Sequence, residues 1–367
     1  MHYLTEFRDP RVAKSLVNQI VKTAEDLDEV KLMEVCGSHT MAIARYGIRN
    51  LLPDHIKLIS GPGCPVCVTP TGYLDKAVAI SRLPGVIIAT FGDMLRVPGS
   101  MSSLEKERSK GSVVEIVYST MDAISLAVDH PDKQVVFLGV GFETTAPTVA
   151  ASILRAGELG LKNYTVLCAH KTIPHAMEQI AAGKKVTLQG FICPPHVSTI
   201  IGSKPYEILA KKYHKSCVIA GFEPLDVLEA VKMLLEEIKS GKPSVQNQYS
   251  RVTTGEGNPL ALKLMNKIFE VCDSEWRGLG TIPGSGLKIK TEFKLYDAEI
   301  RFDVVVEPCL EETGCICGNV MQGISSPFDC SLFGTVCTPE DPVGACMVSS
   351  EGSCAASYKY ERSLEEN

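Results

Sequence analysis

Seven of the chain's 14 cysteines lie between Cys309 and Cys354, in a segment that is otherwise rich in Gly, Pro and Ser. Thiolates are soft donors, typical of iron–sulfur clusters and of zinc sites. Because the segment has few periodic apolar residues with which to build its own core, we expect a metal to organise it. Four thiolates suffice for a 4Fe–4S cluster, and they also bind zinc well.

Several sets of four cysteines in this segment could form such a site. The set with the spacing C-x14-C-x6-C-x16-C consists of Cys315, Cys330, Cys337 and Cys354. This wide spacing differs from the tight cysteine runs of bacterial ferredoxins. It also differs from zinc ribbons, which pair two Cys-x-x-Cys knuckles. The cysteines left over, as extra thiols or core residues, would be Cys309, Cys317 and Cys346.

A second group of thiols lies in the string Gly61-Pro-Gly-Cys64-Pro-Val-Cys67, between an expected strand and an expected helix. A Cys-x-x-Cys pair can close a small disulfide, and the dipole at a helix start lowers the pKa of a thiol there. The motif therefore predicts dithiol–disulfide exchange. The alternative is half of a zinc knuckle, but no second Cys-x-x-Cys in the sequence completes it.

Cys36 follows an expected strand in the string Glu34-Val-Cys-Gly-Ser-His-Thr. The residues after it offer a turn, a helix cap and the imidazole of His39. Cys36 is thus a candidate nucleophile or metal ligand, and its alternative is a small buried hydrophobic side chain at a strand end. Of the eight histidines, only His39 receives a predicted site role.

Short apolar runs alternate with helix-length amphipathic stretches from about residue 30 to 240. This alternation predicts parallel sheets with helices on their faces. The expected strands are Leu32–Val35, Ile56–Ser60, Gly85–Thr90, Ser112–Val117, Gln134–Gly139, Tyr164–Cys168, Leu188–Ile192 and Ser216–Ala220. The expected helices include Thr71–Arg82, Thr145–Ala156, Pro174–Ala182 and Pro224–Lys239.

Eight strands over this length favour two similar open α/β domains over one closed barrel. With the seam at the polar string His130–Lys133, the domains would span residues 30–130 and 131–241. Residues 1–29 and 242–367 would form a third, α-helical and loop-rich domain that holds the cluster. We expect a helix over Arg11–Glu29 to pack against that third domain, a helix over Leu260–Cys272, and loops from Gly280 onward.

Three glycine-containing loops place an acid after an expected strand, at Asp93, Glu143 and Glu223. In open α/β sheets, ligands gather at the carboxyl ends of the strands, so these acids are candidate site walls. The alternative is structural, because glycine makes the turn and an acid favours a helix amino terminus. The sequence leaves the roles of the three acids open.

Composition narrows the partners and the compartment. The net charge of −6 and the lack of a long Lys/Arg tract argue against nucleic acid as the main partner. No apolar run approaches the roughly 20 residues that span a bilayer, and the first residues lack the apolar core of a signal peptide. We therefore expect a cytoplasmic protein whose clustered cysteines bind metal or do redox work.

Five strings together resemble the HypD family of NiFe-hydrogenase maturation factors. They begin at Cys36, Gly61, Phe91, Gly141 and Gly344, reading CGSHT, GPGCPVC, FGDMLRVPG, GFETTAPT and GACMVSSEGSC. They span nearly the whole chain in the family's order. The resemblance implies a cytosolic protein of two similar α/β domains with a third domain that carries a 4Fe–4S cluster.

The resemblance also implies partners. These are a stable complex with the small chaperone HypC, on which an iron with two cyanides and one carbon monoxide is assembled, and transient contact with HypE, the cyanide donor. On its own the protein would be a monomer.

The resemblance also assigns roles to individual residues of this sequence, position by position. Cys36 matches the cysteine that binds this iron, and Cys64 and Cys67 match the redox-active pair. The family's cluster spacing selects Cys315, Cys330, Cys337 and Cys354. The chain departs from the family at Pro194-Pro-His196, where Pro-Gly-His is expected, so a role for His196 stays open.

The resulting hypothesis is a redox-active assembly scaffold rather than an enzyme with conventional turnover. Cyanide and carbon monoxide bind low-spin ferrous iron tightly, and a thiolate can hold such a fragment. One competing hypothesis is an iron–sulfur dithiol oxidoreductase that resembles ferredoxin–thioredoxin reductase. The other is a structural zinc protein with an incidental Cys-x-x-Cys pair.

Overall fold

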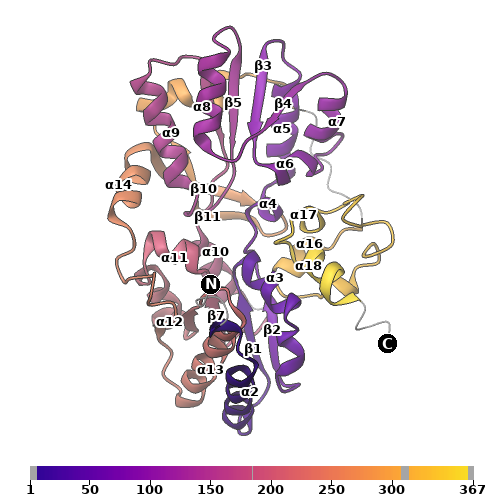
Figure 1. Cartoon of the computed structure of the whole chain (residues 1–367), viewed down its shortest axis with the longest axis vertical. Coiled ribbons are helices and arrows are strands. Elements are labelled where there is room, and N and C mark those ends of the chain that lie inside the picture. Colours follow the sequence, from indigo (N-terminus) through magenta and orange to yellow (C-terminus); the bar gives the residue numbers. More distant parts are fainter. Residues whose placement is uncertain (1–5, 184, 307–313, 363–367) are drawn as a thin grey trace.

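A computed structural model describes residues 6–183, 185–306 and 314–362. In this part of the chain the strands form two parallel sheets and one antiparallel hairpin. Figure 1 shows the two sheets toward opposite ends of the long axis, with the hairpin between them. The predicted α/β class with parallel sheets is confirmed.

The first sheet, sheet A, has the strand order β2-β1-β7-β8-β9, and all its neighbours are parallel. Val30 pairs with Ile56 on one side of β1, and Leu32 pairs with Gly190 on the other. The strands are β1 (Val30–Glu34), β2 (Ile56–Ser60), β7 (Gly190–Cys193), β8 (Ser216–Ile219) and β9 (Val245–Asn247).

The second sheet, sheet B, has the order β4-β3-β5-β6 and is also parallel throughout. Side chains alternate between its two faces, and both faces are buried, as expected for a parallel sheet covered by helices. Its strands are β3 (Val86–Thr90), β4 (Val113–Ile116), β5 (Gln134–Gly139) and β6 (Tyr164–Cys168).

The strand order corrects the expected division of the chain near residue 130. All eight expected strands exist, but β1 and β2 belong to one sheet with β7 to β9, in which β1 pairs with β7, and neither pairs with β3 or β4. Sheet B is therefore inserted between two parts of sheet A. Apolar runs identify buried strands but carry no information on which strand lies beside which, so the sequence pattern could not give this order.

The helices pack around the strands, except the last three, which belong to the cysteine-rich carboxy-terminal segment. They are α2 (Pro10–Ala24), α3 (Gly37–Arg45), α4 (Pro65–Val68), α5 (Thr71–Ser81), α6 (Gly92–Arg96), α7 (Leu104–Ser109), α8 (Thr120–Asp129), α9 (Ala146–Glu158), α10 (Ile173–Ala182), α11 (Pro195–Ile201), α12 (Glu207–Tyr213), α13 (Pro224–Ser240), α14 (Pro259–Ile268), α15 (Ala298–Arg301), α16 (Cys317–Met321), α17 (Ala345–Val348) and α18 (Ser353–Tyr360). Among the described residues, none of these helices has the length and apolar character needed to span a membrane.

The amino-terminal helix α2 packs differently from the expectation. It ends at Ala24, and its buried Leu16 and Ile20 lie in one apolar cluster with residues of α13 and sheet A. It therefore covers a face of sheet A instead of the cysteine-rich segment. Its apolar positions predicted a buried face correctly, but they could not identify the surface that this face meets.

The segment after α14 forms a hairpin where loops and helix were expected. Strands β10 (Phe269–Trp276) and β11 (Gly280–Ile289) pair with a register shift between Cys272 and Ser274. Pro283 and Gly284 lie opposite this shift. These two residues usually argue against a strand, and a bulge is one of the few places that accommodates them.

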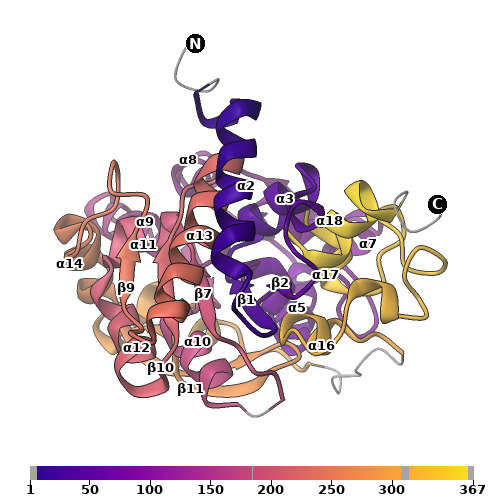
Figure 2. The same cartoon turned by 90° about the horizontal axis from the view of Figure 1, so that it is seen from below.

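The cysteine-rich segment, residues 314–362, holds three short helices and lies along one side of the molecule (yellow in Figures 1 and 2). Its α17 contacts α4, and its α18 contacts α3. The segment thus packs directly against the two elements that carry Cys36 and the Cys-x-x-Cys pair.

Candidate functional site

Cys64 and Cys67 form a disulfide at the start of α4, and their Cα atoms are 5.3 Å apart. This separation lies in the usual range for disulfides. Cys64 is the cap residue of the short helix, and its Sγ accepts a hydrogen bond from the N–H of Cys67 at 3.2 Å. Both residues are buried, so the motif has the geometry required for dithiol–disulfide exchange within a protected loop.

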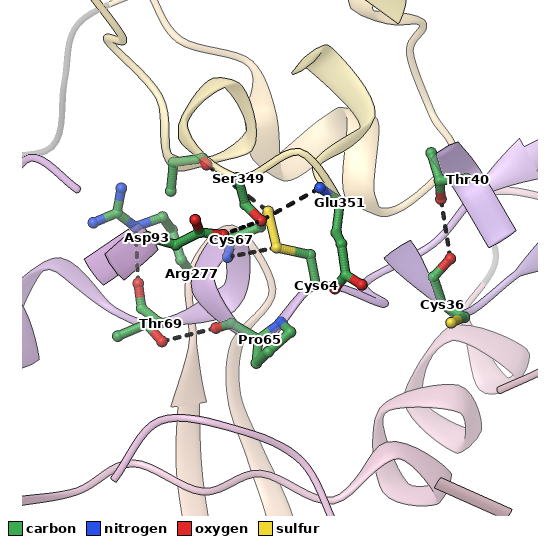
Figure 3. Close-up of a disulfide and its surroundings, with 11 residues drawn as sticks. Cys36, Thr40, Cys64, Pro65, Cys67, Thr69, Asp93, Arg277, Ser349 and Glu351 are labelled. Atoms are coloured by element: carbon green, nitrogen blue, oxygen red, sulfur yellow. Dashed lines mark hydrogen bonds between the residues drawn. A yellow bond between two sulfur atoms is a disulfide. The ribbon is translucent and has the colours of Figure 1, made fainter. Parts of the chain in front are cut away.

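Cys36 lies at the carboxyl end of β1 and caps α3. Its thiol is buried, and burial raises the pKa of that thiol to about 12. The loop of the disulfide runs directly beside it, because the N–H of Gly37 donates to the carbonyl of Gly63 at 3.1 Å. A Cβ on Gly63 would lie 2.2 Å from the backbone N of Cys36, so only glycine permits this approach. Figure 3 shows the two loops side by side, with Cys36 apart from the disulfide.

The imidazole nearest to Cys36 belongs to His196, at the start of α11. Its Nδ1 lies 3.8 Å from the Cys36 Sγ, and its ring stacks on Phe222 with a centroid distance of 5.6 Å. Burial lowers the pKa of His196 to about 4, so the ring is neutral near pH 7. The sequence left His196 without a role. The sequence signal for a role of His196 is its position just after a strand, β7. The structure shows that β7 lies beside β1, the strand that ends next to Cys36.

His39, which the sequence did single out, points elsewhere. Its Nε2 lies 2.9 Å from the carbonyl oxygen of Gly221 and 3.2 Å from that of Ala220. The side chain is fully buried, its Nδ1 has no hydrogen-bond partner, and burial lowers its pKa to about 4. His39 therefore links α3 to the loop after β8 through these contacts and has a structural position next to the site.

The four cysteines with the spacing C-x14-C-x6-C-x16-C line one cavity in the carboxy-terminal segment. Cys317 also lines it, and the remaining wall is apolar. The lining residues are Cys315, Ile316, Cys317, Val320, Cys330, Leu332, Phe333, Cys337, Met347 and Cys354. Residues 315, 330 and 354 are far apart in the sequence, so the fold brings the thiols together.

The two other cysteines of this segment have different positions. Cys346 is buried next to the cavity but does not line it, and its thiol and that of Cys317 hydrogen-bond the thiol of Cys354. These bonds lower the pKa of Cys354. The Sγ atoms of Cys315 and Cys317 are 3.1 Å apart. Cys309 lies outside the described residues.

The donor set fits an iron–sulfur cluster in its chemistry. Four thiolates in an apolar wall are the usual cluster site, and the Cys337 sulfur accepts a hydrogen bond from the N–H of Val343 at 3.4 Å. The free volume between the side chains is only about 10 Å³, so the thiols must separate to admit a cluster. Among the described residues no three Cys, His, Asp or Glu side chains are arranged to hold a single metal ion.

The disulfide adjoins this cysteine-lined region. The Sγ of Cys67 lies 3.8 Å from the carbonyl oxygen of Ala345 in α17. Both disulfide cysteines share one apolar cluster with Cys317, Cys337 and Cys354. The disulfide therefore lies between the loop of Cys36 and the segment that forms the cysteine-lined cavity.

The three loop acids have separate surroundings. Asp93 accepts a hydrogen bond from Ser349 at 2.7 Å, beside the disulfide (Figure 3). Glu143 is buried and accepts from the backbone N–H of Ile173, and burial raises the pKa of this carboxyl to about 8. Glu223 forms an ion pair with Arg8 at the surface. Only Asp93 lies next to the disulfide.

Comparison with known proteins gives the family. Residues 11–361 match the HypD family, described as "Hydrogenase formation hypA family". The chain belongs to the HypD family. It is 49% identical over 369 residues to the hydrogenase maturation factor HypD of Azotobacter vinelandii, covering 99% of this chain and 97% of that protein.

Two further relatives agree with this membership. HypD of Cupriavidus necator is 44% identical over 370 residues, which is 99% of this chain and 98% of that protein. A putative hydrogenase expression/formation protein of Methanocaldococcus jannaschii is also 44% identical, over 98% of this chain and the whole of that protein. The similarity to HypD proteins thus extends over nearly the full chain and confirms the resemblance seen in the motifs.

Proposed function

We propose that this protein is a hydrogenase maturation factor of the cytoplasm that acts as a redox-active scaffold. Together with HypC it would assemble the Fe(CN)2(CO) group of the NiFe-hydrogenase active site, with cyanide delivered by HypE. Family membership supports the general role. One observation supports the mechanism. The loop of Cys36 lies beside the disulfide loop, and the disulfide in turn lies beside the segment that forms the cysteine-lined cavity.

Cys36 is the proposed protein ligand of the iron that is being assembled. A thiol binds metal as a thiolate, so its proton must leave when iron arrives. Burial disfavours the thiolate in the absence of metal, and the neutral His196 ring, with its Nδ1 3.8 Å from the sulfur, is placed to orient the thiol. Burial also keeps water away from the coordination positions that cyanide and carbon monoxide would occupy.

The Cys64–Cys67 pair would exchange electrons beside this iron. Reduction of the disulfide takes up two electrons and two protons and yields two thiols. Cys64 caps the short helix α4 and Cys67 lies within it, so one turn keeps the two sulfur atoms within reach of each other.

We propose that Cys315, Cys330, Cys337 and Cys354 hold a 4Fe–4S cluster. Such a cluster, when bound, supplies single electrons at a potential set by its surroundings. The chain's own contribution is to enclose the four thiols in an apolar wall and to donate backbone N–H groups to sulfur, as Val343 does to Cys337.

The infrared spectrum of the protein co-purified with HypC tests this function. Cyanide and carbon monoxide on iron absorb in a spectral region that is free of protein bands. We expect both kinds of band in the wild-type complex and their loss when HypE is absent from the expressing cells. A complex without these bands, isolated from cells that mature hydrogenase normally, would contradict the scaffold.

A dithiol oxidoreductase is the second candidate, because a disulfide next to a cysteine-lined cavity suits that chemistry as well. Such an enzyme would turn over disulfide substrates without carrying iron-bound cyanide. The same spectrum separates the two functions. A colourless protein that binds zinc and has redox-inert Cys64 and Cys67 would instead support a structural zinc protein.

A further inference from the structure

Phe222, in the loop after β8, contacts both histidines near Cys36. Its ring stacks on that of His196, with a centroid distance of 5.6 Å and an angle of 18° between the planes. The ring of His39 has its centroid 5.5 Å away and is tilted by 47°. No sequence signal marks Phe222, because its approach to the two histidines depends on the fold, and the function proposed above does not use it.

The backbone on both sides of Phe222 is held by hydrogen bonds. On one side, the N–H of Gly221 donates to the Oε1 of Gln248 at 3.0 Å. On the other side, the N–H of Glu223 donates to the Oδ2 of Asp226 at 3.3 Å, and Glu223 caps α13. The residue that carries the ring is therefore fixed through both of its neighbours.

A buried carboxylate, that of Asp226, organises these bonds. Asp226 is 1% exposed, and its Oδ1 accepts from the Nε2 of Gln248 at 2.9 Å. Its Oδ2 accepts from the guanidinium of Arg251 at 2.7 Å. The Cζ of that guanidinium lies 4.3 Å from the ring centroids of both Phe7 and Tyr249. Asp226, Gln248 and Arg251, here called the Asp226 network, thus keep the loop after β8 in one place, because paired buried polar groups make their surroundings rigid.

The His196 ring has fewer constraints of its own. The residue is partly exposed, and among the described residues its one hydrogen-bond contact is with the Cys36 thiol. A histidine at such a position can turn toward solvent about its two side-chain bonds. Stacking on a ring that is itself fixed opposes this rotation. The orientation of the imidazole toward Cys36 therefore depends on Phe222.

We propose that Phe222 is a positioning residue of the Cys36 site. Its ring holds the His196 imidazole against the thiol, and the Asp226 network holds the ring. Within the described part of the chain Phe222 makes no bond to Cys36 itself, so it acts through the imidazole. The consequence for iron rests on the function proposed above, whereas the contact between imidazole and thiol does not depend on that function.

The S–H stretching band of Cys36 tests this contact in the full chain without iron. Subtracting the infrared spectrum of the Cys36→Ala form in each background isolates the band, whose frequency changes when the thiol is bonded to an imidazole. Phe222→Leu keeps an apolar side chain but removes the flat ring. We expect it to lower the ratio of bonded to free thiol about fivefold, an effect typical of an aromatic pair. Phe222→Tyr keeps the ring and should retain the wild-type ratio.

Phe269→Leu is the matched control. Phe269, in β10, also packs its ring against a buried histidine, His170, with a centroid distance of 5.6 Å. The same atoms are lost from a buried position, but the histidine concerned does not contact Cys36. This variant should leave the Cys36 band unchanged.

The complex with HypC provides the second measurement. In Phe222→Leu the cyanide and carbonyl bands should fall in the same proportion as the bonded thiol, because the imidazole no longer orients Cys36. Phe222→Tyr and Phe269→Leu should keep both kinds of band. Recovery in the tyrosine variant separates a requirement for the ring from a general loss of packing.

The outcomes separate this proposal from the function on which its second part rests. An unchanged Cys36 band in Phe222→Leu, or an equal change in Phe269→Leu, would overturn the positioning role. A changed thiol band with undiminished cyanide and carbonyl bands would also overturn it, since the iron site would then not need the contact. Absence of cyanide and carbonyl bands from the wild type would instead contradict the scaffold, and the thiol band would still show whether Phe222 positions His196.

Discussion

The buried thiol of Cys36 has its pKa raised to about 12, yet a thiol must lose its proton to bind iron. Together, these two facts would favour metal binding by Cys36 over other reactions of its thiol. Because the thiolate is the reactive form of cysteine, burial of this thiol would slow its oxidation and alkylation. Coordination of the proposed iron would have to offset the free-energy cost of removing this proton.

Cys36→Ala should abolish the cyanide and carbonyl bands while leaving the iron–sulfur absorption unchanged. The reason is that Cys36 lies just before α3, outside the cysteine-lined cavity, so only the proposed iron ligand is lost. Infrared and visible spectra of the variant co-purified with HypC measure both properties. Undiminished bands would exclude Cys36 as the ligand and move the iron to Cys64 or Cys67.

The two histidines near Cys36 provide a comparison. We expect His196→Ala to weaken the bands strongly, because its imidazole faces the thiol. His39→Ala should be milder for the iron, because its Nε2 faces backbone carbonyls. A complete loss in His39→Ala together with a normal spectrum in His196→Ala would reverse these assignments.

Cys64 and Cys67 should interconvert between disulfide and dithiol while the rest of the protein stays folded. Differential alkylation and mass spectrometry across a series of glutathione ratios would give the reduction potential of the pair. The half-buried Cys272 and Cys168 supply internal references, since neither is disulfide-bonded. Two free thiols under oxidising conditions, in a protein with its cluster intact, would contradict a redox role.

At the scale of elements, Gly63 joins the disulfide loop to the start of α3. Gly63→Ala places a Cβ 2.2 Å from the Cys36 backbone N, so the loops must separate. We expect a loss of about 1–3 kcal/mol in the free energy of unfolding, as for other overpacked sites. A thermal or denaturant unfolding curve measures this, and the infrared bands should weaken in parallel.

Gly72→Ala is the matched control for this prediction. Gly72 lies in the first turn of α5, and a Cβ there would meet no atom within 4 Å. The substitution should be neutral or stabilising by up to about 1 kcal/mol. Equal destabilisation by the two changes would mean that the close approach at Gly63 is not what fixes the loop.

Single strands and helices could be predicted from the sequence, because their signals lie within a few neighbouring residues. The alternation around β1 to β8 and the apolar faces of α5 and α13 gave type and position within a few residues. The β10–β11 hairpin did not follow, since Pro283 and Gly284 disguise a strand that a bulge permits. His196 was missed for a related reason, because its approach to Cys36 depends on β7 lying beside β1.

At the scale of the whole molecule, the four cysteines of the proposed cluster site act together. Cys330→Ala or Cys337→Ala should remove or degrade the cluster and destabilise residues 314–362, because metal binding and folding are coupled. Cys346→Ala should do much less, since Cys346 does not line the cavity, and Cys317→Ala also leaves four thiols. Iron content and visible absorption after anaerobic purification measure the difference.

A result in which Cys346→Ala loses iron and Cys330→Ala retains it would refute this ligand set. The set itself came from the family's spacing, and the sequence alone allowed several others. The fold brings those four thiols to one cavity, but it adds Cys317 to the same wall. The spacing in the sequence could not reveal that Cys317 lines the cavity as well. Cys315 and Cys317 are only two residues apart, and spacing does not show that both side chains point to the same cavity.

The turn at Ser349–Glu351 holds the two sheets and the cysteine-rich segment in one arrangement. Ser349 donates to Asp93 in α6, next to sheet B, and Glu351 accepts from Ser38 in α3, next to sheet A. Ser349 and Glu351 thus bond to both α/β units, and Figure 3 shows the two residues near the disulfide. Any movement of one sheet relative to the other would alter the surroundings of the disulfide.

The insertion of sheet B within sheet A also sets an order of events during synthesis. Strand β1 can pair with β2 once both have left the ribosome, but its other edge has no partner until β7 emerges. At 5–20 residues per second this interval lasts roughly ten seconds. Sheet B is complete in the meantime, whereas Cys315 to Cys354 emerge last. We therefore expect the β1 edge beside Cys36 to stay unpaired for seconds in a nascent chain, and a chaperone that covers this edge would act before Cys315 to Cys354 have emerged.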